Sequence, residues 1–188
     1  MRGKRPAHLF WPDHGPSSRS LFLHDVLPVD PIDTMSFRGL MGQFATGVCV
    51  VSACDPDGVP FGITVNSFVS VSLEPPLIAW SVQNSATLFE LWTQASAFAV
   101  SILAEDQAEV AERYAASGQC ELQPDDFTFS PRHLPRLNGA LGHLECCNWS
   151  TYPAGDHTMV FGEVIDIERT TRDRPLGFFG GEFCQIPG

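Results

Sequence analysis

The chain has 188 residues, 44% of them apolar, and its formal net charge is -11 at pH 7. This length and composition favour one domain with a substantial core over two small domains. An acidic surface repels a phosphate backbone, so we expect no nucleic-acid binding, and no apolar run is long enough to cross a membrane.

Residues 1–34 are rich in Pro, His and Ser and have no sustained periodicity. We expect them to form a disordered or dispensable extension before a folded domain at 35–188. The domain opens with a short amphipathic helix, for which Ser36 is the expected N-cap. Its apolar residues have the spacing i, i+3, i+4 and i+7 on one face: Phe37, Leu40, Met41 and Phe44.

Short apolar runs separated by turn signals predict a succession of strands with few helices. Asp55-Pro-Asp-Gly58 indicates a hairpin turn, and Ser85 is the expected N-cap of a helix that runs to Trp92. A second helix is expected at 105–116, and a Pro-rich connection at 123–138. The expected strands lie at 47–54, 59–65, 67–73, 77–82, 98–103, 141–151, 158–169 and 178–184.

This succession of strands predicts a mainly β fold. Many short strands without a repeated strand–helix alternation are typical of an antiparallel β-barrel. The sequence has neither a Gly-x-Gly-x-x-Gly fingerprint after a strand nor a P-loop. A doubly wound nucleotide-binding fold is therefore disfavoured.

The six cysteines include no Cys-x-x-Cys pair, and four of them lie in apolar, strand-like runs. We therefore expect reduced, mostly buried thiols in a cytoplasmic protein. His143, Cys146 and Cys147 are close in sequence, but neighbouring strand residues point to opposite faces. A metal site is not expected there.

Polar residues in three distant segments are candidates for a binding site. In the first segment, 61–68, Gly62 permits close backbone approach, and Thr64, Asn66 and Ser67 lie among apolar neighbours. Hydroxyl and amide groups beside apolar side chains suit a planar amphipathic ring. Taken alone, however, the segment is better explained as a strand with an ordinary polar face.

The other two segments are equally ambiguous when each is taken alone. Ser81-Val-Gln-Asn-Ser-Ala-Thr87 offers N–H groups and hydroxyls to an anion, although Ser85 acting only as a helix cap explains it as well. Gly155-Asp156-His157 places an imidazole at the rigid start of a strand, where Asp156 could hold the ring. A simple hairpin turn would use the same residues.

Several motifs with a common order and spacing resemble one known family. They are Phe37-Arg-Gly-Leu-Met-Gly-Gln-Phe-Ala-Thr-Gly-Val48, Thr64-Val-Asn-Ser-Phe-Val-Ser-Val-Ser-Leu-Glu-Pro-Pro76, Phe98-Ala-Val-Ser-Ile-Leu103 with Gln107, Ala154-Gly-Asp-His-Thr158 and Phe178-Phe-Gly-Gly-Glu-Phe183. Together they resemble the short-chain flavin reductases, the reductase components of two-component flavin-dependent monooxygenases.

The resemblance implies a mainly β, antiparallel Greek-key split β-barrel with a few short helices, usually a homodimer, that binds FMN or FAD. It implies an NAD(P)H:flavin oxidoreductase, a flavoprotein that reduces flavin with NADH or NADPH and supplies a partner monooxygenase. Such hydride transfer needs no nucleophile or metal from the protein.

Two alternatives carry less weight than a flavin reductase. One is a non-catalytic flavin-binding electron carrier, which would have no use for the intact Gly-Asp-His segment. The other is a split-barrel oxidase that uses bound FMN on another substrate, which the register of the motifs disfavours.

The resemblance also implies a role for individual residues. Residues near the isoalloxazine or ribityl chain would be Gly62, Thr64, Asn66 and Ser67. Those near the phosphate would be Ser81, Gln83, Ala86, Thr87 and Arg113. The nicotinamide side would be lined by His157, Phe178, Phe179 and Gly181, with His157 positioning the nicotinamide. Because the body has no lysine near the phosphate loop, where relatives often have a basic residue, the choice between FMN and FAD stays open.

Overall fold

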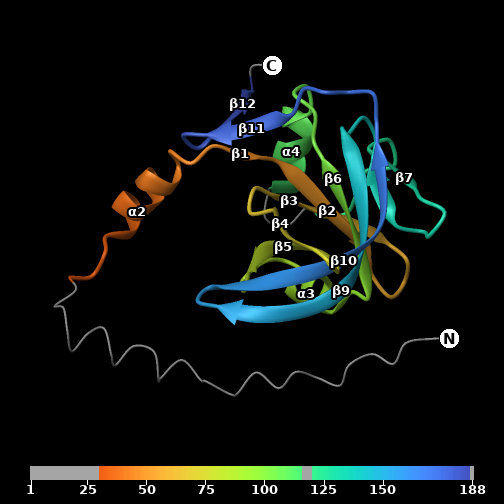
Figure 1. Ribbon diagram of the computed structural model, residues 1–188, viewed down its shortest axis with the longest axis horizontal. Helices are drawn as coiled ribbons and strands as arrows, with labels where there is room; N and C mark the ends of the chain where they lie inside the picture. Colours follow the sequence, from red (N-terminus) through yellow and green to blue (C-terminus); the bar gives the residue numbers. More distant parts are fainter. Residues whose placement is uncertain (1–29, 116–119, 187–188) are drawn as a thin grey trace. The chain divides into compact units, whose positions relative to one another are not determined.

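Seven antiparallel strands form the main sheet, in the order β3-β2-β6-β9-β10-β5-β4 (Figure 1). The computed structural model describes residues 30–115 and 120–186. The strands of this sheet are β2 Cys49–Cys54, β3 Pro60–Val65, β4 Val69–Leu73, β5 Pro76–Gln83, β6 Ala97–Ile102, β9 Gly142–Ala154 and β10 His157–Arg169. The mainly β, antiparallel architecture predicted from the strand pattern is thereby confirmed.

Two smaller sheets complete the β structure. A three-stranded sheet has the order β1-β11-β12, and β7 pairs with β8 in a hairpin. Their bounds are β1 Thr46–Gly47, β7 Phe127–Phe129, β8 Pro135–Leu137, β11 Leu176–Phe179 and β12 Glu182–Gln185. The sequence predicted neither the β7–β8 hairpin in the Pro-rich connection nor the division of the last strand. That division occurs at Gly180 and Gly181, which both have positive φ and form the turn between β11 and β12.

The chain divides into two compact units, Met1–Arg38 and Gly39–Gly188. Of the extension predicted at 1–34, residues 1–29 lie outside the described part of the chain. Helix α2, Thr34–Met41, confirms the predicted amphipathic helix, but the expectation that Ser36 is its N-cap was wrong. The backbone N–H of Ser36 donates to Asp33 Oδ2 at 2.8 Å, so Asp33 is the residue that caps this end.

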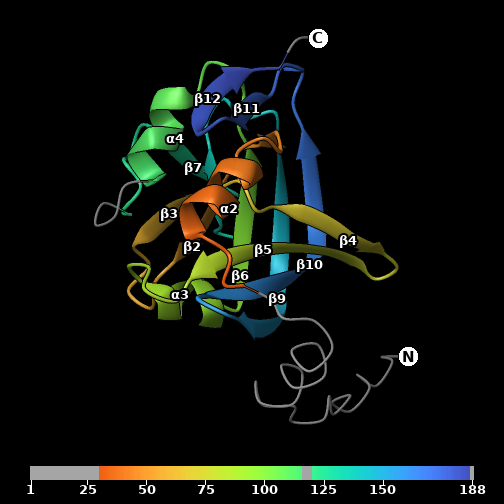
Figure 2. The same cartoon turned by 90° about the vertical axis from the view of Figure 1, so that its left-hand side faces the viewer.

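Helix α3, Phe89–Gln94, begins three residues later than predicted, so the assignment of Ser85 as its N-cap was also wrong. The N-cap is Leu88, which has a left-handed backbone and makes no side-chain capping bond. Residues 84–88 form turns instead. Helix α4, Ala108–Ala115, lies within the helix predicted at 105–116. Figure 2 shows α4 beside β2 and β3, and α3 at the other end of the same side.

Trp80 on β5 is the centre of the hydrophobic core and is fully buried. Its ring packs edge-on against Trp92 of α3 at 6.3 Å and against Phe98 of β6 at 6.0 Å between ring centroids. These contacts hold α3 against the sheet, directly after the turns at 84–88. No helix in the described residues has the length and hydropathy that a bilayer span requires.

The connection between β3 and β4 carries the chain from one edge of the main sheet to the other. Ser67, in this connection, is fixed to β5 by two hydrogen bonds. Its hydroxyl accepts from the N–H of Ser81 at 3.0 Å and donates to the carbonyl of Ser81 at 3.3 Å. The end of β3 is thereby held beside the end of β5.

Gly162 on β10 leaves room for core side chains that pack directly over it. A Cβ atom at this position would lie 2.6 Å from Phe98 Cζ and 2.9 Å from Cys146 Cβ. We expect Gly162→Ala to lower the free energy of unfolding by about 1–3 kcal/mol, because the core would have to shift to admit one methyl group. Urea unfolding followed by tryptophan fluorescence measures the change.

Gly47→Ala is the matched control, because a Cβ at Gly47 meets no atom within 4 Å. Equal stability of the two alanine variants would contradict this account of the packing around Gly162.

Candidate functional site

A pocket of about 570 Å³ opens where the ends of β3 and β5 meet helix α4. Strand β3 and the residues after it form one wall, and β5 with the turns that follow it forms another. The pocket is lined by Ile63, Thr64, Val65, Asn66, Ser67, Ser81, Val82, Gln83, Ser85, Ala86, Thr87, Tyr114, Ala115, Cys120 and His157.

All three candidate segments contribute to this pocket. Of the residues predicted from sequence, the pocket brings together Thr64, Asn66, Ser67, Ser81, Gln83, Ala86, Thr87 and His157. Sequence reasoning missed Tyr114 and Cys120, which approach from α4 and from the segment after it. The helical spacing of buried Ala111 and Tyr114 could have indicated that this face of α4 points inward.

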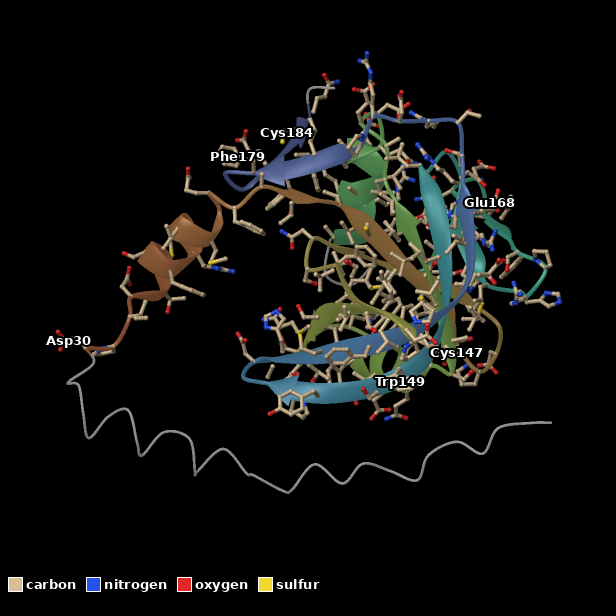
Figure 3. The ribbon with its side chains drawn as sticks, viewed as in Figure 1. Asp30, Cys147, Trp149, Glu168, Phe179 and Cys184 are labelled. Atoms are coloured by element: carbon tan, nitrogen blue, oxygen red, sulfur yellow. The ribbon has the colours of Figure 1, made fainter. Side chains whose placement is uncertain are left out.

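Five predicted residues do not line the pocket. Gly62 faces the opposite way, where a Cβ would lie 2.6 Å from Leu122 Cδ2. Phe178, Phe179 and Gly181 belong to the β11–β12 hairpin of the small sheet. Figure 3 shows Phe179 on this hairpin with Cys184, apart from Trp149 on β9. A role for these residues in binding flavin or nicotinamide stays a prediction.

Arg113, the fifth, is engaged by a carboxylate. Its guanidinium forms an ion pair with Asp126, and this hydrogen bond raises the pKa of Arg113. Tyr114 also donates its hydroxyl to Asp126, and burial together with that bond raises the pKa of Tyr114. Asp126 therefore holds the end of α4 in place, and contact of Arg113 with a phosphate stays a prediction.

Three hydroxyl groups of the pocket, those of Thr64, Ser67 and Tyr114, are used by the fold. Thr64 Oγ1 donates to the carbonyl of Ala111 at 2.8 Å, which joins β3 to α4. The hydroxyl of Ser67 is fully engaged with the backbone of Ser81. The exposed amides of Asn66 and Gln83 make no side-chain hydrogen bond within the described residues, so they are the polar groups best placed to meet a ligand.

His157 is the first residue of β10 and pairs with Gln83 of β5. Its Nδ1 lies 2.7 Å from Asp156 Oδ1, which confirms the expectation that Asp156 holds the ring. The Nε2 atom is therefore the ring nitrogen that can face a ligand. A ring fixed by both the strand and a carboxylate can position a second planar ring beside it.

Asn84 joins the hairpin tip that carries His157 to the turns after β5. Its backbone N–H donates to the carbonyl of Asp156 at 2.9 Å, and its Nδ2 donates to the carbonyl of Gly155 at 3.2 Å. Its Oδ1 accepts from Thr158 Oγ1 at 2.9 Å. Three hydrogen bonds from one residue thus fix the position of His157 relative to the segment 81–87.

The described lining of the pocket contains no lysine or arginine. An anionic group would therefore have to be held by backbone N–H groups and hydroxyls in the turns at Ser85–Thr87. Half-buried Ile63 and Ala86 supply apolar surface, and the amides supply polar contacts at its edge. This combination suits a planar, amphipathic ring with a phosphate at one end.

Comparison with known proteins gives a family match over most of the chain. Residues 41–187 match the family model described as the flavin reductase like domain. The chain is 39% identical to the FMN reductase (NADH) SmoA of Agrobacterium fabrum, over 80% of this chain and 85% of that protein. It is 34% identical to the flavin-dependent monooxygenase reductase subunit HsaB of Rhodococcus jostii, over 84% of this chain and 80% of the relative.

Solved structures show the same fold. The chain is similar to the Streptomyces globisporus NADH:FAD oxidoreductase SgcE6 in complex with NAD and FAD fragments, with 37% identity and a TM-score of 0.77. This similarity covers 85% of this chain and 96% of that one. The antiparallel split β-barrel implied by the resemblance is therefore confirmed.

The hydrogen bonds of Asn84 can be tested by substitution. We expect Asn84→Ala to lower the free energy of unfolding by about 1–3 kcal/mol, because the carbonyl of Gly155 and the hydroxyl of Thr158 lose their partner. Urea unfolding measures the difference. Asn66→Ala is the matched control, since the Asn66 side chain makes no hydrogen bond within the described residues, and its effect should stay below about 0.5 kcal/mol. The role of Asn84 would be refuted by equal stability of the two variants.

Proposed function

The chain belongs to the flavin reductase like family, and from this membership we propose that it reduces FMN or FAD with NADH or NADPH. The reduced flavin is passed to a separate monooxygenase. We assign this activity to the domain at 35–188, which contains the matched residues 41–187. Relatives named as an NADH-dependent FMN reductase and as a monooxygenase reductase subunit support the proposal.

The pocket between β3, β5 and α4 supports flavin binding on its own geometry. Its volume of about 570 Å³ lies within the range of small-molecule sites. Half-buried Ile63 and Ala86 provide apolar contact for an isoalloxazine ring, and the amides of Asn66 and Gln83 face its polar edge. The juxtaposition of these three segments, each ambiguous alone, is the observation that carries the proposal.

The flavin phosphate is held in this proposal by the turns at Ser85–Thr87. Ala86 contributes backbone, and Thr87 adds a hydroxyl. Neutral groups bind a phosphate less tightly than a lysine or arginine would, because they supply no full charge. Weaker binding suits a protein that takes up flavin and then releases it to a partner.

His157 positions the nicotinamide of NADH or NADPH. The bound flavin would supply the hydride acceptor, at its N5 atom, for the hydride of the nicotinamide. Strand β10, Asp156 and Asn84 fix the imidazole, so its Nε2 is pre-organised to contact the incoming nucleotide. Aligning the two reacting rings is the contribution that this chemistry requires from a protein.

A homodimer is part of this proposal. Strand β4 lies at an edge of the main sheet, and a register irregularity between Ser70 and Ser72 interrupts its alternation. Val69, Val71 and Leu73 of this strand are exposed by 50%, 48% and 93%, and we propose that a second copy covers this apolar surface.

We also place the protein in the cytoplasm. Burial raises the pKa of the Cys49 and Cys146 thiols to about 12, so both stay protonated within the core. The three cysteines that are only half-buried, Cys54, Cys147 and Cys184, are free thiols, and we take this as a sign of a reducing compartment.

The reductase proposal predicts that the purified protein oxidises NADH or NADPH only when FMN, FAD or riboflavin is added. Absorbance at the nicotinamide band measures the reaction. Failure to oxidise either nucleotide with any of the three flavins would refute the proposal. A protein that binds flavin without ever reducing it would be an electron carrier instead.

Substitution of His157 tests its positioning role. We expect His157→Ala to raise the KM for the nicotinamide nucleotide about 3- to 10-fold, the loss of one hydrogen bond, and to change kcat by less than about twofold. Thr151→Ala, an exposed position on β9 of the same hairpin, is the control and should leave both constants unchanged. A His157→Ala enzyme with unaltered KM would remove His157 from the nicotinamide site.

A further inference from the structure

A second pocket, of about 490 Å³, adjoins the first on the outer side of β3. Thr87 and Cys120 line both pockets, so the two form one continuous groove. Along β3, Phe61 faces the second pocket and Val65 the first. The two residues are four positions apart along the strand, roughly 13 Å. A ligand that fills both pockets is therefore extended along this strand.

Because Gly62 has no side chain, the segment that forms a wall of the second pocket can lie directly against β3. The segment 120–122 runs alongside β3, where the N–H of Gly62 donates to Cys120 at 2.6 Å and the N–H of Leu122 donates to Pro60 at 2.9 Å. Phe61 and Glu121 form a β-bridge. Any larger residue at position 62 would push Leu122 away, because a Cβ there lies only 2.6 Å from Leu122 Cδ2.

The residues of this pocket match the parts of an adenosine. The half-buried ring of Phe61, with Leu88 and Pro124, offers apolar surface for a purine. The side-chain amide of Gln123 can pair with the polar edge of adenine, since a donor and an acceptor lie side by side on both. The exposed carboxylate of Glu121 can accept hydrogen bonds from ribose hydroxyls, as acidic residues do in other dinucleotide sites.

We propose that the second pocket holds the adenosine half of FAD while the first holds its isoalloxazine ring. This inference rests on the proposed flavin reductase function and makes FAD the preferred flavin. The pyrophosphate passes Thr87, the residue at the junction of the pockets. FAD and NADH both contain adenosine, so the ligand chemistry that this pocket fits is an adenosine nucleotide. The experiment must therefore distinguish FAD from NADH as its occupant.

The test substitutes Gln123, whose side chain is exposed and whose side-chain amide makes no hydrogen bond within the described residues. We expect Gln123→Ala to raise the KM for FAD about 3- to 10-fold, the loss of one or two hydrogen bonds. The KM for FMN, and the KM for NADH measured with FMN as acceptor, should not change. Gln94→Ala, an exposed glutamine at the end of α3 outside both pockets, is the matched control.

Equal effects of Gln123→Ala on FAD and FMN, or no effect on either, would overturn the proposal. A raised KM for NADH with FMN as acceptor would also overturn it, because the pocket would then belong to the nicotinamide nucleotide. Adenosine 5′-monophosphate should compete with FAD and leave the reduction of FMN unaffected.

A binding measurement separates this inference from the reductase proposal. Titration of FAD and FMN by fluorescence requires no turnover, and wild-type protein should bind FAD more tightly than FMN, with the difference reduced in Gln123→Ala. If no flavin is reduced but this difference in affinity is found, the proposed function fails and the adenosine pocket stands. If flavins are reduced but wild type and Gln123→Ala bind FAD equally well, the adenosine pocket fails and the reductase stands.

Discussion

The three hydrogen bonds of Asn84 are the constraint on which the geometry of the site depends. They connect the tip of the β9–β10 hairpin to the turns after β5, two segments that lie about seventy residues apart in the chain. Without them, His157 would be held only by the pairing at the end of a strand and by its exposed neighbour Asp156. With them, the imidazole and the proposed phosphate turns form one rigid edge of the pocket.

A second set of contacts forms the opposite wall of the pocket. Ser67 ties the β3–β4 connection to β5, and Thr64 ties β3 to α4. Both hydroxyls thus serve the fold first, and the uncommitted amides of Asn66 and Gln83 are left to meet a ligand. The lining has no cation among the described residues, in keeping with the acidic charge of the chain. Recognition by neutral groups, which bind and release readily, fits a protein that delivers reduced flavin.

The sequence predicted the strands and most of the pocket because both follow from local patterns. Short apolar runs indicate strands such as β5 and β10, and polar residues in the candidate segments indicated Thr64 and His157, whereas Gln83 was implied by the resemblance. The contacts that depend on packing could not be predicted in this way. Gly62 is an example: the flavin contact that the resemblance implies there stays a prediction, and the close approach that its missing side chain permits is made by the chain's own Leu122.

Other features that the sequence did not predict depend on the local backbone or on contacts between distant segments. Ser85 has the chemistry of a helix cap, yet Leu88 has a left-handed backbone, which cannot continue a helix, so α3 begins only at Phe89. The ion pairs of buried Glu145 with Arg132 and Arg136 could not be predicted either, because both arginines lie in the β7–β8 hairpin, whose strands no periodicity indicated.

The central claim is that flavin lies in the pocket between β3, β5 and α4, with His157 beside its reactive ring. A crystal structure of the protein with FMN bound tests this most directly. The account predicts the isoalloxazine ring against the segments 64–67 and 81–83, and the phosphate at the turns of Ser85–Thr87. Flavin bound at the β11–β12 hairpin, or anywhere outside this pocket, would contradict it.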